Sequence, residues 1–83
     1  MKKRLEYYGA EWCGPCQSLK PIIKELKESG LNIEIIDIDE SSDRAVKNGV
    51  RSVPTVIIYK DGEIFERMIG FKSKEEIVYL MSE

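Results

Sequence analysis

The stretch Trp12-Cys13-Gly14-Pro15-Cys16 sets two cysteines three positions apart, between a predicted strand and a predicted helix. The strand is predicted from the apolar and aromatic residues that precede the stretch, and the helix from apolar residues at helical spacing after it. Unpaired backbone N–H groups and the positive end of the helix dipole meet where such a helix begins. Both favour a thiolate, so the sequence predicts a lowered pKa for the Cys13 thiol.

The spacing of the two cysteines suits thiol–disulfide exchange. Cys16 lies one helical turn beyond Cys13, so it can displace a mixed disulfide that Cys13 has formed. Gly14 and Pro15 suit the tight turn and the first helical residues. The alternative, a metal half-site, lacks ligands because the chain has two cysteines and no histidine. Only a site shared between chains or completed by carboxylates would remain, and we expect no bound metal.

The order of predicted elements indicates one α/β domain over residues 1–83. A mixed four-stranded sheet flanked by three helices is the economical architecture for the order β-α-β-α-β-β-α. The expected elements are a strand at 4–10, a helix at 15–29, a strand at 32–39, a helix from Ser41 or Ser42 to about 49, strands at 55–60 and 63–69, and a helix from 73 to about 81.

Local signals support several of these boundaries. Pro21 lies inside the first helical pattern and is expected to kink it. Asp61-Gly62 is typical of a two-residue hairpin turn. Ser73, followed three residues later by Glu76, resembles a capping box at the start of the last helix. Glu6 lies in the middle of the first strand and is expected on a partly solvated face of the sheet.

Composition excludes several classes of partner. The chain has 83 residues with 13 basic and 15 acidic side chains, for a formal net charge of −2. This mixed balance argues against nucleic acid or an anionic membrane as a partner. The basic start at residues 2–4 is followed by no apolar stretch of signal-peptide type, and no run is long enough to span a membrane. We therefore expect a cytoplasmic protein.

Several separated motifs resemble the thioredoxin family. The stretch 10–16 is similar to the family's active site nearly letter for letter, and Pro21 matches its helix-kinking proline. The stretch 49–55 resembles the segment that carries the family's cis proline, 60–63 resembles its hairpin turn, and 69–70 its groove glycine. The resemblance runs from about residue 7 to the end of the chain and implies a thioredoxin fold.

The resemblance also implies a function and a set of site residues. Cys13 and Cys16 would reduce disulfides of protein substrates, with their own redox-active disulfide as the only cofactor-like group. Pro54 would be a cis proline beside Cys13, and Val53 would offer backbone groups to an extended substrate. The expected substrate-binding residues are Trp12, Val53, Pro54 and Gly70, with Phe71 as a further member of an apolar docking surface.

The resemblance also implies a redox partner and leaves alternative functions open. We expect a monomer recharged by a donor similar to thioredoxin reductase. The Gly14-Pro15 dipeptide resembles that of the family's reductases, whereas its isomerases and strong oxidants commonly carry a histidine there. The alternatives are a glutaredoxin-like electron donor recharged by glutathione and a non-catalytic binding module with the same fold. The glutathione-binding signals of glutaredoxins are absent from the sequence.

The departures from the family concern proton transfer. Tyr7 stands where the family has a buried aspartate, Ile35 where it has the accompanying lysine, and Gly9 where it has a tryptophan. A phenol is a poor base at neutral pH because its pKa is near 10. Water is therefore the expected acceptor of the Cys16 proton, with Glu11 a less favoured helper.

Overall fold

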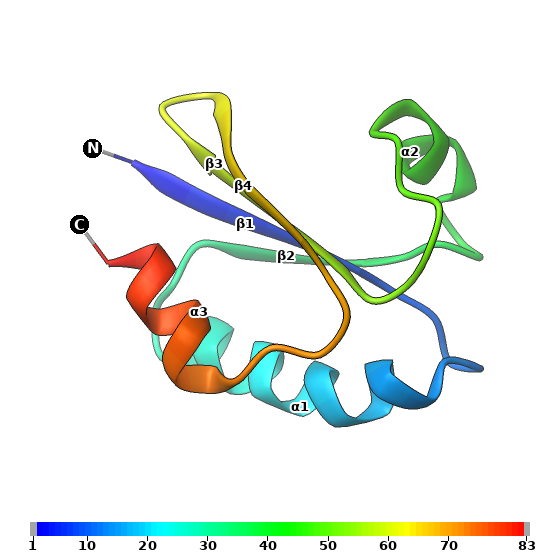
Figure 1. Cartoon of the computed structure of the whole chain (residues 1–83), viewed down its shortest axis with the longest axis horizontal. Helices are drawn as coiled ribbons and strands as arrows, with labels where there is room; N and C mark the ends of the chain where they lie inside the picture. Colours follow the sequence, from blue (N-terminus) through cyan, green and yellow to red (C-terminus); the bar gives the residue numbers. More distant parts are fainter. Residues whose placement is uncertain (1, 83) are drawn as a thin grey trace.

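The computed structural model describes residues 2–82, which form one mixed sheet and three helices (Figure 1). The strand order is β2-β1-β3-β4, with β1 parallel to β2 and the other two pairings antiparallel. The expected fold class is confirmed. The elements are β1 (Lys3–Gly9), α1 (Gly14–Glu28), β2 (Ile33–Asp37), α2 (Ser42–Lys47), β3 (Thr55–Lys60), β4 (Glu63–Ile69) and α3 (Lys74–Met81).

Most local signals act as expected. The hairpin residues Asp61 and Gly62 both have positive φ, 54° and 88°, as the turn requires. The Ser73 hydroxyl accepts the backbone N–H of Glu76 at 3.2 Å and caps α3. Helix α1 continues through Pro21. Ser41 occupies the N-cap position of α2, and its side chain makes no capping hydrogen bond.

The face of the sheet under α1 and α3 carries the main apolar core. Alternate residues of β1 and β3 point to this face because strand side chains alternate between the two sides. The two helices cover it from below in Figure 1. Fully or nearly fully buried residues of this core include Leu5, Tyr7, Leu19, Ile23, Leu26, Ile33, Val56, Ile58, Ile77 and Met81.

The opposite face, under the short helix α2, combines a smaller apolar cluster with a polar network around Glu6. Glu6 is only 4% exposed, so the expected partly solvated position is wrong. Its carboxylate pairs with Arg4 at 2.6 Å and Arg44 at 3.2 Å, and accepts hydrogen bonds from the hydroxyls of Tyr8 and Tyr59. These four side chains cover the carboxylate, which is why a charged residue is buried here.

No helix among residues 2–82 is long and apolar enough to cross a membrane.

Candidate functional site

Two cysteines meet at the beginning of α1. Cys13 is the N-cap residue, and Gly14 and Pro15 are the first two residues of the helix. Cys13 and Cys16 are joined by a disulfide and are 5% and 2% exposed. The Cys13 sulfur accepts the backbone N–H of Cys16 at 3.2 Å. The helix end therefore directs a donor at the Cys13 sulfur, an arrangement that stabilises negative charge there.

The loop before β3 and the end of β4 complete the surroundings of Cys13. The Val53–Pro54 peptide bond is cis, the isomer that the sequence resemblance implies. The carbonyl oxygen of Val53 lies 3.5 Å from the Cys13 sulfur. The backbone N–H of Gly70 donates to the carbonyl of Pro54 at 2.9 Å. The fold thus brings residues from three distant parts of the chain together around one sulfur.

Two exposed aromatic side chains, Trp12 and Phe71, adjoin residues of this site in the sequence. Trp12 is 67% exposed, and its indole N–H donates to Asp39 at 2.9 Å, which fixes the ring beside the cysteines. Phe71, next to Gly70, is 50% exposed, and Val53 is half-buried. The ring of Pro54 is buried, so the expectation that it adds to an exposed apolar surface is wrong. Pro54 lies beneath that surface instead.

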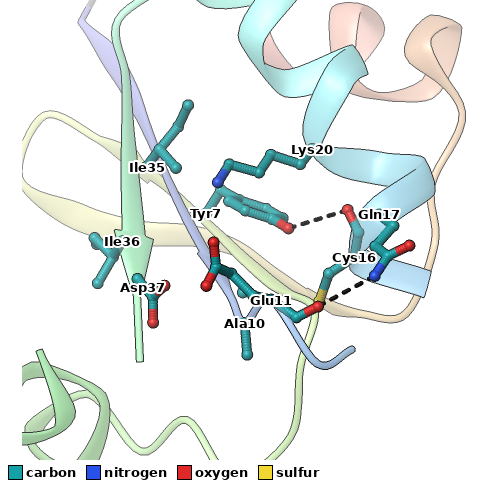
Figure 2. A pocket seen from close by; sticks show the side chains of 10 residues that line it. Tyr7, Ala10, Glu11, Cys16, Gln17, Lys20, Ile35, Ile36 and Asp37 are labelled. Atoms are coloured by element: carbon teal, nitrogen blue, oxygen red, sulfur yellow. Dashed lines mark hydrogen bonds between the residues drawn. The ribbon is translucent and has the colours of Figure 1, made fainter. Parts of the chain in front are cut away.

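A cavity of about 260 Å³ opens behind Cys16, on the α1 side of the sheet (Figure 2). Its lining includes Cys16 itself and three charged side chains, Glu11, Lys20 and Asp37. The three come from the loop before α1, from α1 and from the end of β2. The rest of the lining is mostly apolar, but the cavity has room for water, and the charged side chains offer it hydrogen-bond partners.

The side chain of Tyr7 forms one wall of this cavity. Its hydroxyl donates to the carbonyl of Cys16 at 3.4 Å (Figure 2). Burial, with the negative charge of Asp37 in addition, raises the pKa of the phenol. The ring passes over Gly9, where a built Cβ atom would overlap the tyrosine hydroxyl. Tyr7 therefore depends on the glycine two residues later.

Sequence reasoning singled out Glu11 but not Lys20 and Asp37, the other two charged side chains of the lining. Lys20 is one of several lysines on α1, and Asp37 ends a strand like many aspartates do. The available signal was the joint departure at positions 7, 9 and 35, which changes the space behind Cys16. Among residues 2–82, no group of three or more histidine, cysteine, aspartate or glutamate side chains is placed to hold a metal ion.

The chain is similar to thioredoxins over nearly its whole length. A family model described as thioredoxin matches residues 2–83. A thioredoxin of Bacillus subtilis is 44% identical over 78 residues, which cover 90% of this chain and 75% of the relative. A thioredoxin of Chlamydia muridarum is 44% identical over 75 residues, which cover 88% of this chain and 74% of the relative.

Solved structures agree with the sequence matches. A mutant thioredoxin from Halobacterium salinarum superposes with a TM-score of 0.87 at 36% identity, covering 96% of this chain and 72% of that structure. The fold of the present chain, its paired cysteines at the start of α1 and the sequence matches all indicate the same family. The chain belongs to the thioredoxin family and is a dithiol–disulfide oxidoreductase.

Proposed function

We propose that Cys13 is the attacking thiolate and Cys16 the resolving thiol in the reduction of protein disulfides. The observation that carries this assignment is the hydrogen bond from the Cys16 N–H to the Cys13 sulfur at the N-cap of α1. A charge-stabilising donor acts on Cys13, whereas Cys16 lies inside the first turn and is the more deeply buried of the two.

The exchange proceeds in two balanced steps. The Cys13 thiolate attacks one sulfur of the substrate disulfide, and the other sulfur leaves as a thiolate that takes a proton from solvent. Cys16 then loses its proton and attacks the Cys13 sulfur, which releases the second substrate thiolate. The substrate gains two electrons and two protons, and the protein retains the Cys13–Cys16 disulfide.

The substrate binds over Trp12, Val53 and Gly70, with Pro54 supporting Val53 from below. The exposed indole, the half-buried valine and the bare backbone at Gly70 leave room for an extended chain beside the sulfur. The carbonyl of Val53 already faces Cys13 at 3.5 Å, so backbone groups of the loop lie within reach of a substrate strand. Exposed apolar surface of this kind is typical of interaction sites.

The remaining features of the proposed function concern the setting of the reaction. The protein acts in the cytoplasm as a monomer. It is a single domain over residues 1–83, and its own disulfide is its only redox group. A donor similar to thioredoxin reductase returns the disulfide to the dithiol. The mixed surface charge supports protein substrates rather than nucleic acid.

Two assays test the redox activity and the assigned roles of the cysteines. Reduction of insulin by dithiothreitol, followed by turbidity, should be accelerated by the protein. Alkylation of the reduced protein across a pH series should show one fast-reacting cysteine, Cys13, with a pKa below the free value of about 8.5. Faster alkylation of Cys16 than of Cys13 would overturn the assignment of roles. Coupled assays with thioredoxin reductase, or with glutathione and its reductase, identify the donor.

A further inference from the structure

The cavity behind Cys16 separates the buried sulfur from a carboxylate on the neighbouring strand. Asp37 is paired with Gly9 in the parallel register of β1 and β2. Because Gly9 has no side chain, the Tyr7 hydroxyl lies over it, and Asp37 and Cys16 both line the cavity beside this hydroxyl. The wall of one cavity thus carries both the thiol that must lose a proton and a carboxylate.

Asp37 is held in a fixed position. One of its carboxylate oxygens accepts the backbone N–H of Asp39 at 2.8 Å, in a turn that follows the end of β2. The other oxygen takes no part in that turn. The side chain is half-buried, and its charge raises the pKa of the Tyr7 phenol in addition to the effect of burial. The carboxylate therefore acts electrostatically on the wall of the cavity.

Two other residues are poor candidates for taking the proton. Tyr7 keeps its proton at neutral pH, because its pKa is raised above the ordinary value of 10. Glu11 also lines the cavity, but it is exposed, and the hydrogen bond that holds it runs from the Gln17 side chain to its backbone carbonyl at 3.1 Å (Figure 2). That bond fixes the backbone of Glu11 and leaves its carboxylate unpositioned.

We propose that Asp37 is a positioning residue that orients a cavity water to accept the proton of Cys16 during resolution of the mixed disulfide. In this step the thiol proton passes to the water, and a proton of the water passes toward Asp37 and on to solvent. The Cys16 thiolate then attacks the Cys13 sulfur, and the substrate thiolate leaves. The inference rests on the proposed roles of the two cysteines.

Titratable groups lie around the cavity on each element that lines it. Lys20 approaches from α1, Glu11 from the loop before α1, and Tyr7 from β1, while Asp39 follows Asp37 on the other side of the turn. Of the three carboxylates, Asp37 alone combines the lining of the cavity with a side chain fixed by a hydrogen bond. Lys20 supplies a positive charge that favours the Cys16 thiolate once it has formed.

The test separates the two steps of exchange in one stopped-flow experiment. The reduced protein is mixed with an excess of a symmetric aromatic disulfide whose free thiolate absorbs visible light. The first release reports attack by Cys13 and depends on reagent concentration, whereas the second reports resolution by Cys16 and does not. Asp37→Asn keeps an oxygen for the Asp39 N–H, and Glu11→Gln is the matched control on the same cavity.

The expected result is a selective loss. Asp37→Asn slows the second release by about 10²-fold, the low end of the effect of a general base, while the first release stays within about twofold. Glu11→Gln leaves both phases within about twofold. An unchanged second release in Asp37→Asn, or an equal slowing in both variants, would overturn the inference. Absence of a first release in the unaltered protein would instead overturn the proposed function.

Chemical rescue distinguishes positioning of water from a structural role. Added formate, a carboxylate small enough for the cavity, should restore the second release of Asp37→Asn and leave the unaltered protein unchanged. Without the carboxylate, hydroxide must take the proton, so the second release of the variant should rise about tenfold per pH unit near neutrality. A variant with no rescue and an unaltered pH profile would show that Asp37 supports only the fold.

Discussion

Tyr7 and Tyr8 are adjacent in β1, but their hydroxyls end in very different surroundings. On the α2 face, the Tyr8 hydroxyl donates to Glu6 and accepts from Asn48, both at 2.8 Å. On the α1 face, the Tyr7 hydroxyl makes one long contact of 3.4 Å, to Cys16, beside an open cavity.

The two faces of the sheet therefore have different roles, one in stability and one in the chemistry. The α2 face is a closed network in which burial and contact with Glu6 raise the pKa of Tyr8 to about 12. The α1 face leaves polar groups and space next to the reacting sulfur. On the α2 face, hydrogen bonds between the polar groups fix the structure. On the α1 face, the cavity gives solvent and charged side chains access to the reacting cysteines.

Substitution of either cysteine by serine should give the largest effect on activity, and the structural change should be confined to the α1 face. Cys13→Ser removes the attacking sulfur and should abolish insulin reduction. Cys16→Ser retains attack but not resolution, so mixed disulfides with substrate should accumulate on non-reducing gels. Both variants keep the network around Glu6 and should have native far-ultraviolet circular dichroism. A Cys16→Ser protein that forms no covalent adducts would contradict the assignment.

Glu6→Gln should break the α2 face while leaving the chemistry alone. Removal of the charge leaves two arginines without their shared partner and weakens the bonds from the two tyrosines, so the free energy of unfolding should fall by about 1–3 kcal/mol. Urea denaturation measures this loss. Glu66→Gln, at an exposed position of β4, is the control and should change stability by less than about 0.5 kcal/mol.

The same carboxylate makes the α2 face sensitive to acid. Burial alone would raise the pKa of Glu6, but hydrogen bonds from Arg4 and the two tyrosines, together with the charge of Arg4, hold it below the ordinary value of 4.5. A lowered pKa stabilises the folded state above pH 4.5, and this contribution is lost as the pH falls through the folded-state value. The stability difference between the protein and Glu6→Gln should therefore shrink below pH 4.5. A constant difference down to pH 2 would argue against an ionised Glu6.

Val53→Asp should weaken substrate binding by more than it weakens the fold. A negative charge beside Cys13 disfavours the thiolate and the approach of an apolar substrate, so the rate of insulin reduction should fall by about tenfold. Val46→Asp makes the same change on α2, at a side chain that is 79% exposed, and should leave the rate within about twofold. Equal losses of rate and stability in Val53→Asp would indicate a core role for this valine.

Tyr7→Phe should give the smallest effect, although its hydroxyl contacts the backbone of Cys16. The substitution removes one long hydrogen bond and no base, because the raised pKa keeps the phenol protonated at neutral pH. Resolution of the mixed disulfide should stay within a few-fold of the unaltered rate. A slowing of 10²-fold or more, measured as the second release described above, would show that the tyrosine takes part in proton transfer.

Sequence patterns sufficed where the physics is local. The hairpin at Asp61 and Gly62 and the cap at Ser73 were predictable because backbone conformation and one nearby hydrogen bond decide them. The N-cap position of Cys13 follows from the turn that Gly14 and Pro15 allow. Each of these features depends on residues within four positions of one another.

Features that join distant segments were not predictable. The burial of Glu6 depends on Arg44, which lies 38 residues later on α2, and on Tyr59 in β3. The buried position of Pro54 depends on how the ends of β3 and β4 pack. The cavity behind Cys16 requires the pairing of Gly9 with Asp37 across two strands. Contacts between residues so far apart in the chain leave no periodic pattern in the sequence.

The overlap between the Tyr7 ring and any side chain at position 9 makes the evolution of these two positions dependent on order. A lineage that keeps this tyrosine ring in its present position must keep glycine two residues later, because a Cβ atom there would overlap the ring and its hydroxyl. A larger residue at position 9 becomes acceptable only after position 7 has changed. The two positions are thus inherited as a unit, and a substitution harmless in a relative would be damaging when transplanted alone into this chain.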